Sequence, residues 1–132
     1  MNSKVFLGGT CAETTWRDIL IKMLQIPYFN PVVEDWTSEC QANEVYEKEH
    51  ECNIHFYCIT ADMIGVFSIA EVVDSVHMKN KRTILHILPD GFGKAQLKSL
   101  YAVVDLINSR GGIAYIDNDF ERSANVLNYC FS

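Results

Sequence analysis

The sequence of 132 residues lacks long apolar runs and any cluster of basic residues. Its longest uncharged stretch of interest, residues 52–61, is about half of the ~20 residues that a helix needs to cross a bilayer. The N-terminal segment has one lysine and a short apolar stretch before two glycines, which is not the pattern of a signal peptide. These absences predict a cytoplasmic protein that does not enter a membrane.

Acidic residues outnumber basic ones, with 17 Asp and Glu against 11 Lys and Arg, a net charge of −6. Proteins bind a nucleic-acid backbone through clustered Lys and Arg. The charge balance therefore argues against a nucleic-acid polymer and favours a small molecule or a protein as partner. Hydrophobic residues make up 48% of the chain, enough to bury a core, and the length predicts a single domain over residues 1–132.

Cysteine occurs five times, an odd number with no Cys-x-x-Cys pair. A disulfide framework or a zinc knuckle needs paired, regularly spaced cysteines, so we expect reduced and mostly buried thiols. His50, Cys52 and His55 lie close in sequence but lack the spacing of a structural zinc site. No metal is expected.

Short apolar segments alternate along the chain with segments of helical periodicity. The five predicted strands are residues 4–7, 28–29, 54–60, 83–88 and 113–116. The five predicted helices are residues 15–24, 38–51, 68–76, 97–107 and 120–129. Ser38 and Gln41 have the spacing of a capping box at the start of the second helix, and Gly111 with Gly112 predicts the end of the fourth.

Strands that alternate with helices imply right-handed crossovers and a parallel sheet with helices on both faces. The predicted fold class is therefore α/β with three layers. The commonest order of five such strands is 2-1-3-4-5, which opens a crevice at the carboxyl ends of strands 1 and 3. Ligands bind in this crevice, which nominates Gly8, Gly9 and Thr10, the loop 60–65 and the helix that begins at Ser68.

Two carboxylates are predicted to face this crevice. Asp62 follows the central strand, and Glu71 lies near the start of the next helix. Paired carboxylates suit glycosyl chemistry, in which one attacks or stabilises the sugar carbon while the other handles the proton of the leaving group. Structural roles also explain these residues, since Ser68 and Glu71 have the spacing of a capping box and Asp62 fits a loop-capping aspartate.

Side chains suited to a nucleobase follow the second strand. Asp35 beside Trp36 offers a carboxylate next to a flat surface on which a base can stack. Trp36 could equally fold back onto the core, and Phe67 has the same two interpretations. The candidate substrate-binding residues are Gly8, Gly9, Thr10, Asn30, Pro31, Asp35, Trp36, Phe67 and Ser68.

Several stretches occur in an order and spacing more specific than any single motif. They are residues 5–10 (VFLGGT), Trp16-Arg17, residues 28–33 (YFNPVV) with Asp35-Trp36, and Ile59-Thr60 followed by residues 67–71 (FSIAE). Over nearly residues 4–117 the chain resembles the nucleoside 2-deoxyribosyltransferase-like family. The resemblance implies a flavodoxin-like, and hence Rossmann-like, sheet.

The resemblance also implies an activity. Glu71 would be the nucleophile on C1′ of a 2′-deoxynucleoside or nucleotide, and an aspartate near Asp62 would assist protonation of the departing base. The base leaves, and a second base or water resolves the covalent glycosyl-glutamate with net retention, without a cofactor. Family enzymes often complete the pocket with an asparagine of a neighbouring subunit, which implies a homo-oligomer; Asn125 and Asn128 stand near the C-terminus, and neither is assigned.

Other classes of function use the same fold. A non-catalytic module that binds or sequesters a nucleotide would keep the pocket, with Glu71 as a helix cap and ribose ligand. Flavin binding is a further alternative, with Thr10, Thr14 and Thr15 near a phosphate. A receiver-type signalling domain is excluded because the first strand is followed by glycines rather than an acidic pair. Arg17 is the candidate for binding a 5′-phosphate, or it pairs with a carboxylate on a helix.

Overall fold

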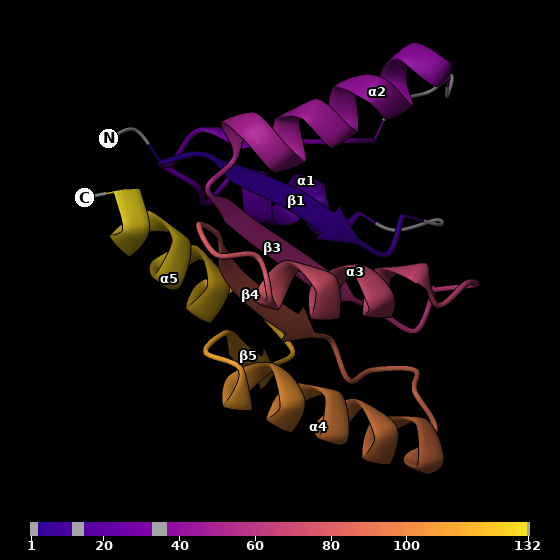
Figure 1. The fold of residues 1–132 in the computed structure, drawn as a ribbon. Helices are drawn as coiled ribbons and strands as arrows, with labels where there is room; N and C mark the ends of the chain where they lie inside the picture. Colours follow the sequence, from indigo (N-terminus) through magenta and orange to yellow (C-terminus); the bar gives the residue numbers. More distant parts are fainter. Residues whose placement is uncertain (1–2, 12–14, 33–36, 132) are drawn as a thin grey trace.

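The computed structural model describes residues 3–11, 15–32 and 37–131, which form a five-stranded sheet with helices on both faces (Figure 1). All neighbouring strands are parallel, and their order is β2-β1-β3-β4-β5. The strands are β1 (Val5–Gly9), β2 (Tyr28–Phe29), β3 (Ile54–Ile59), β4 (Arg82–Ile87) and β5 (Ile113–Ile116). The predicted fold class and strand order are confirmed.

Two hydrophobic cores fix the layers. On one face of the sheet, Trp16 and Leu20 of α1 (Trp16–Ile21) and Leu127 of α5 (Glu121–Phe131) are buried against the strands. On the other face, Val72 of α3 (Phe67–Val76) and Val104 of α4 (Lys94–Ser109) are buried. Every residue of β3 is buried, as expected for a central strand that is covered on both sides.

A further helical segment lies between β2 and β3. The helix α2 (Ser38–Tyr46) continues into a π-helical turn, η1 (Glu47–Glu51). The backbone N–H of Cys52 donates to the carbonyl oxygen of Glu47 at 2.7 Å, five residues back. Single π turns are rare and occur often at functional sites.

The two predicted capping boxes are wrong. The side chain of Thr37, not Ser38, caps α2, because its hydroxyl oxygen accepts a hydrogen bond from the N–H of Cys40 at 3.2 Å. The helix α3 begins at Phe67, its N-cap residue is Val66, and no side chain caps it. Ser68 therefore lies inside the helix, and the carboxylate of Glu71 is available for another partner.

The end of β1 requires glycine. Gly9 has a φ of +110°, in the left-handed region, and it pairs in register with Cys58 of β3. A Cβ atom at Gly9 would lie 2.1 Å from the carbonyl oxygen of Cys58. The close approach of the two strands therefore excludes every side chain at this position. Gly111, with a φ of +93°, ends α4 as predicted.

None of the five cysteines, all of which lie in the described residues, is in a disulfide. Cys52 and Cys58 are buried, whereas Cys11 is exposed and Cys40 and Cys130 are intermediate. The expectation of mostly buried thiols is therefore wrong, because three of the five stand in a loop or on helices at the protein surface. Across residues 3–11, 15–32 and 37–131, no helix has the length and apolar character needed to span a membrane.

Candidate active site

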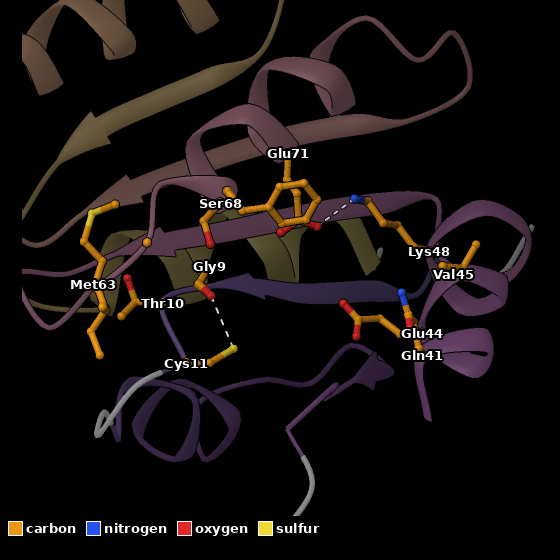
Figure 2. A pocket seen from close by; sticks show the side chains of 13 residues that line it. Gly9, Thr10, Cys11, Gln41, Glu44, Val45, Lys48, Met63, Ser68 and Glu71 are labelled. Carbon is orange, nitrogen blue, oxygen red and sulfur yellow. Dashed lines mark hydrogen bonds and ion pairs between the residues drawn. The ribbon is translucent and has the colours of Figure 1, made fainter. Parts of the chain in front are cut away.

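A cavity of about 540 Å³ opens at the carboxyl end of β1, between α2 and the start of α3 (Figure 2). Its size is typical of small-molecule sites. Its lining consists of Gly9, Thr10, Cys11, Gln41, Glu44, Val45, Lys48, Met63, Ile64, Gly65, Phe67, Ser68 and Glu71. A second cavity of about 280 Å³ shares Gly9, Cys11, Glu44 and Glu71 with the first. The crevice predicted from the strand order is therefore present.

The turn after β1 forms the floor of the cavity and is tied to β3. The hydroxyl oxygen of Thr10 accepts a hydrogen bond from the N–H of Thr60 at 3.0 Å, and the N–H of Thr10 donates to Cys58 at 2.9 Å. Thr10 is buried, and Gly8 lies against the ring of Tyr57. The turn is thus a fixed surface against which a ligand can be bound, and Gly8, Gly9 and Thr10 all line one or both cavities.

Glu71 enters the cavity from α3 and meets a cation of the π turn. The ammonium of Lys48 donates to Oε2 of Glu71 at 2.9 Å (Figure 2). Only 14% of the Lys48 side chain and 15% of the Glu71 side chain are exposed, so water screens this pair less than an ion pair on the surface. The carboxylate therefore lies in the crevice in a defined orientation.

Glu44 brings a second carboxylate into both cavities, from α2. Burial raises the pKa of Glu44, and the charge of Glu71 raises it further, while Lys48 and Arg17 oppose this. An acid whose pKa is raised beside a second carboxylate is suited to donate a proton. The site thus holds one carboxylate with a direct cationic partner and one with a raised pKa.

Sequence reasoning missed Glu44 and Lys48. Both lie on the helix predicted over residues 38–51, where only the capping signal was interpreted. Gln41, Glu44, Val45 and Lys48 have the spacing i, i+3, i+4 and i+7, which places them on one side of a helix, and all four line the larger cavity. A polar stripe on a helix of a doubly wound fold is a signal that would have found them.

The structure does not bring Asp62 and Glu71 into one cavity. Asp62 lines a separate hollow of about 410 Å³ near Thr15, Asp90 and Asn118. The backbone N–H of Asp62 donates to the hydroxyl oxygen of Thr60 at 3.2 Å, within the loop that follows β3. Asp62 and Glu71 are nine positions apart, and the loop between β3 and α3 lies between them. The strand order alone does not fix the course of that loop.

The side chain of Arg17 is hydrogen-bonded to backbone carbonyl groups. Its guanidinium donates to the carbonyl oxygens of Leu7 at 2.9 Å, Thr10 at 2.8 Å and Gly9 at 3.4 Å. The side chain also lies over the ring of Trp16, 4.3 Å from its centroid, and only 4% of the residue is exposed. Arg17 therefore binds the end of β1 and the turn after it, together with Sγ of Cys11 at 3.5 Å, rather than a carboxylate on a helix. A 5′-phosphate would have to compete for these donors.

The remaining candidates divide into three groups. Phe67, Ser68 and Pro31 line the cavities, and 74% of Phe67 is exposed. Asn30 accepts a hydrogen bond from the N–H of Val32 at 3.1 Å and does not line either cavity in the described residues. Asp35 and Trp36, predicted to bind a base, lie outside the described residues.

Asn128 and His55, two further residues considered from the sequence, have hydrogen-bond partners of their own. Asn128 accepts a hydrogen bond from the N–H of Gln25 at 2.7 Å and donates to the carbonyl oxygen of Met23 at 2.9 Å. His55 contacts Ser75 and the backbone of Lys48, both at 2.7 Å, so its ring nitrogens do not converge with His50 and Cys52. Within the part of the chain that the structure describes, no group of three or more His, Cys, Asp and Glu side chains is arranged to hold a metal ion.

Comparison with known proteins gives one match. A family model described as nucleoside 2-deoxyribosyltransferase like matches residues 2–90. That range contains β1, α2, β3 and α3, and therefore every residue that lines the two cavities. No curated protein and no solved structure gives a significant match.

Proposed function

Because the chain belongs to the nucleoside 2-deoxyribosyltransferase-like family, we propose that it breaks the N-glycosidic bond of a 2′-deoxynucleoside and passes the sugar to a second base or to water. The observation that carries the proposal is the position of Glu71, whose carboxylate lines a cavity of ligand size together with a second carboxylate. Two carboxylates around one sugar carbon are the usual machinery for this bond.

In the first half of the reaction, a carboxylate oxygen of Glu71 attacks C1′. The C1′–N bond breaks, its electron pair goes to the departing base, and an ester between C1′ and Glu71 forms. In the second half, an acceptor base or water attacks C1′ on the face opposite Glu71, from which the first base left. The bond between C1′ and Glu71 breaks, and the carboxylate is released. Two displacements give net retention. Glu71 is the catalytic nucleophile of this proposal.

The departing base needs a proton, and we assign that proton to Glu44. Glu44 shares both cavities with Glu71, whereas Asp62 lies in a different hollow. In the first half, the Glu44 carboxyl protonates a ring atom of the base as the C1′–N bond breaks. In the second half, the Glu44 carboxylate takes a proton from the incoming water or acceptor base. Asp62, the candidate for this role from the sequence, is the alternative, and a comparison of Glu44→Gln with Asp62→Asn on the same substrate distinguishes the two.

The charges of the cavities favour a nucleoside over its 5′-monophosphate. The cations among the described lining residues are Lys48, which is paired with Glu71, and Arg17, whose guanidinium is bound to backbone carbonyls. The segments 12–14 and 33–36 contain no Lys or Arg in the sequence. A phosphate would meet carboxylates without a free cation, a combination that costs binding free energy.

The direct test is to incubate the protein with each 2′-deoxynucleoside and each 5′-monophosphate, with and without an acceptor base, and to separate the products by chromatography. Release of base without acceptor identifies a hydrolase, and exchange that needs the acceptor identifies a transferase. Glu71→Gln should abolish turnover and leave substrate affinity largely intact, because the amide keeps the shape but cannot attack C1′. Glu39→Gln, an exposed change on α2, is the matched control and should keep full activity.

A protein that binds nucleosides without releasing base in any of these assays would instead be a non-catalytic binding module. In that case the only effect of Glu71→Gln would be on the affinity for the nucleoside. The proposal also includes a homo-oligomer, which rests on the family resemblance, and a cytoplasmic location, which is the expectation from the sequence alone. Sedimentation of the purified protein at several concentrations checks the oligomeric state.

A further inference from the structure

Lys48 binds one of the two carboxylate oxygens of Glu71, the proposed nucleophile. Its ammonium donates to Oε2 of Glu71 at 2.9 Å, while no described residue is recorded as a partner of Oε1. The ammonium also lies 5.8 Å from the ring centroids of both Phe6 and Tyr57. These rings come from β1 and β3, so the cation is held between the floor of the cavity and the carboxylate.

Burial alone would lower the pKa of Lys48, but Tyr57 and Glu71 raise it above its ordinary value. The lysine is therefore an ammonium at neutral pH. A cation in direct contact with Glu71 stabilises the negative charge of the group that attacks the carbon.

The backbone of Lys48 is fixed by a buried chain of hydrogen bonds. The carbonyl oxygen of Lys48 accepts a hydrogen bond from Nε2 of His55 at 2.7 Å. Since burial lowers the pKa of His55 to about 4, the ring is neutral, and its Nδ1 must accept from the hydroxyl of Ser75 at 2.7 Å. Ser75 in turn contacts Thr83 of β4 at 2.7 Å.

This chain joins the two helices that carry the ion pair. Ser75 lies four residues after Glu71 in α3, and so one turn further along the same side of the helix. His55 connects that turn to the π turn η1, in which Lys48 lies. The register of η1 against α3 is therefore set by buried contacts, independent of the Lys48–Glu71 bond itself.

On the basis of the proposed function, we infer that Lys48 is a positioning residue: by binding Oε2 of Glu71 it fixes the carboxylate in the cavity and leaves Oε1 to attack C1′. No proton moves in this role. When the bond between Oε1 and C1′ forms, Lys48 remains an ammonium beside Oε2, and when the ester is resolved the full carboxylate charge returns to its side.

Lys48 also divides the tasks of the two carboxylates. Two carboxylates that share a cavity repel each other, and one of them tends to take up a proton. Because the direct bond of Lys48 goes to Glu71, the negative charge is stabilised on the nucleophile, and Glu44 is left as the group that carries the proton. Without the lysine, this preference would weaken.

The test uses Lys48→Met, Lys48→Arg and the exposed control Lys98→Met on α4. Each is assayed on a 2′-deoxynucleoside that the wild type cleaves and on 7-methyl-2′-deoxyguanosine, whose base leaves without being protonated. Lys48→Met should lower kcat by about 10- to 100-fold on both substrates, the usual range for loss of a hydrogen bond to a charged group, with KM nearly unchanged. Lys48→Arg should recover most of the rate, and Lys98→Met should match the wild type.

The comparison of the two substrates separates positioning of the nucleophile from an effect on the acid. On 7-methyl-2′-deoxyguanosine the acid Glu44 is not needed, so a loss of kcat on this substrate comes from the nucleophile. Lys48→Met should therefore lose a similar factor of kcat on both substrates, with KM nearly unchanged, and Lys48→Arg should recover it. A variant that only disturbs the fold would raise KM as well and would not be rescued by arginine.

The outcomes are distinguishable. If the wild type cleaves both substrates and Glu71→Gln cleaves neither, but Lys48→Met keeps its kcat, the inference about Lys48 is wrong and the proposed function stands. An increase of kcat in Lys48→Met also overturns the inference, because the ion pair would then be inhibitory. If the wild type cleaves neither substrate, the proposed function fails, and the role of Lys48 fails with it.

Discussion

Arg17 and Thr10 are joined by a hydrogen bond of 2.8 Å, from the guanidinium of the first to the carbonyl oxygen of the second. The same guanidinium binds the carbonyl oxygens of Leu7 and Gly9. An arginine that looks like a phosphate ligand in the sequence is therefore a brace for the turn that forms the cavity floor. Burial lowers the pKa of Arg17, and the guanidinium, which stays charged in proteins, binds carbonyl groups at the end of β1.

The first prediction is that Arg17→Met destabilises the fold without creating or removing recognition of a phosphate. Its loss removes the side-chain donor of the Leu7 carbonyl oxygen, whereas Thr10 keeps a hydrogen bond from Trp16 and Gly9 keeps one from Cys11. We expect a cost of about 2 kcal/mol of unfolding free energy. Arg17→Lys should lie between the two proteins, because one ammonium cannot reproduce the fork of donors. Urea denaturation measures the difference, with the exposed Arg110→Met as control. A stable Arg17→Lys protein with an altered preference between nucleoside and nucleotide would contradict this role.

A second prediction concerns the glycine that lets β1 approach β3. Gly9→Ala meets both a φ of +110° and a carbonyl oxygen 2.1 Å from the new Cβ atom. Gly111→Ala is the matched control, since its φ is +93° but nothing lies within 4 Å of the new atom. The control should lose about 1 kcal/mol from backbone strain alone, and Gly9→Ala should lose several times more, measured by urea denaturation. Equal losses would mean that the backbone of β1 shifts freely, which would contradict the fixed floor.

The fold was predictable because its signals are local and mutually consistent. The β-branched and aromatic run of β3 and the glycines after β1 and α4 each indicate one structure, and the alternation of strands and helices then leaves few topologies. The cap of α2 was placed one residue late because threonine and serine are adjacent and both are good caps. Propensity cannot choose between such neighbours, since the choice depends on the exit angle of the preceding chain.

The site was predictable only in part. Glu71 follows from topology, because the start of the helix after the central strand must face the switch point of the sheet. Its partner Lys48 does not follow from topology, because it is 23 residues away in the sequence and lies in a π turn. No periodicity of the sequence predicts that turn. Asp62 shows the converse, since its position after the central strand predicted that it shares the crevice with Glu71, whereas it lines a separate hollow.

A third prediction is that a ligand protects one thiol from alkylation. Cys11 is exposed and lines both cavities, whereas burial raises the pKa of Cys52 to about 12 and raises that of Cys58 as well. Iodoacetamide reacts with thiolates, so peptide mapping should find Cys11 modified long before the two buried thiols. A saturating 2′-deoxynucleoside should slow the modification of Cys11 and leave that of Cys130, on α5, unchanged. Equal protection of both would indicate a general tightening of the fold rather than occupation of the cavity.

The last prediction links the buried chain behind Lys48 to stability. Burial lowers the pKa of His55 from 6.5 to about 4, so between these values the unfolded chain binds a proton that the folded protein does not. Unfolding free energy must therefore fall as the pH falls from about 6.5 towards 4, and a shift of this size corresponds to about 3 kcal/mol.

The pKa of His86 is also lowered by burial, so part of the wild-type slope belongs to that residue. In His55→Gln the fall over this range should be smaller by about 3 kcal/mol, while His77→Gln, at an exposed position on α3's C-terminal end, should keep the wild-type slope. Chemical denaturation at a series of pH values gives both curves, and an unchanged slope in His55→Gln would mean that the ring is not held neutral between Ser75 and Lys48.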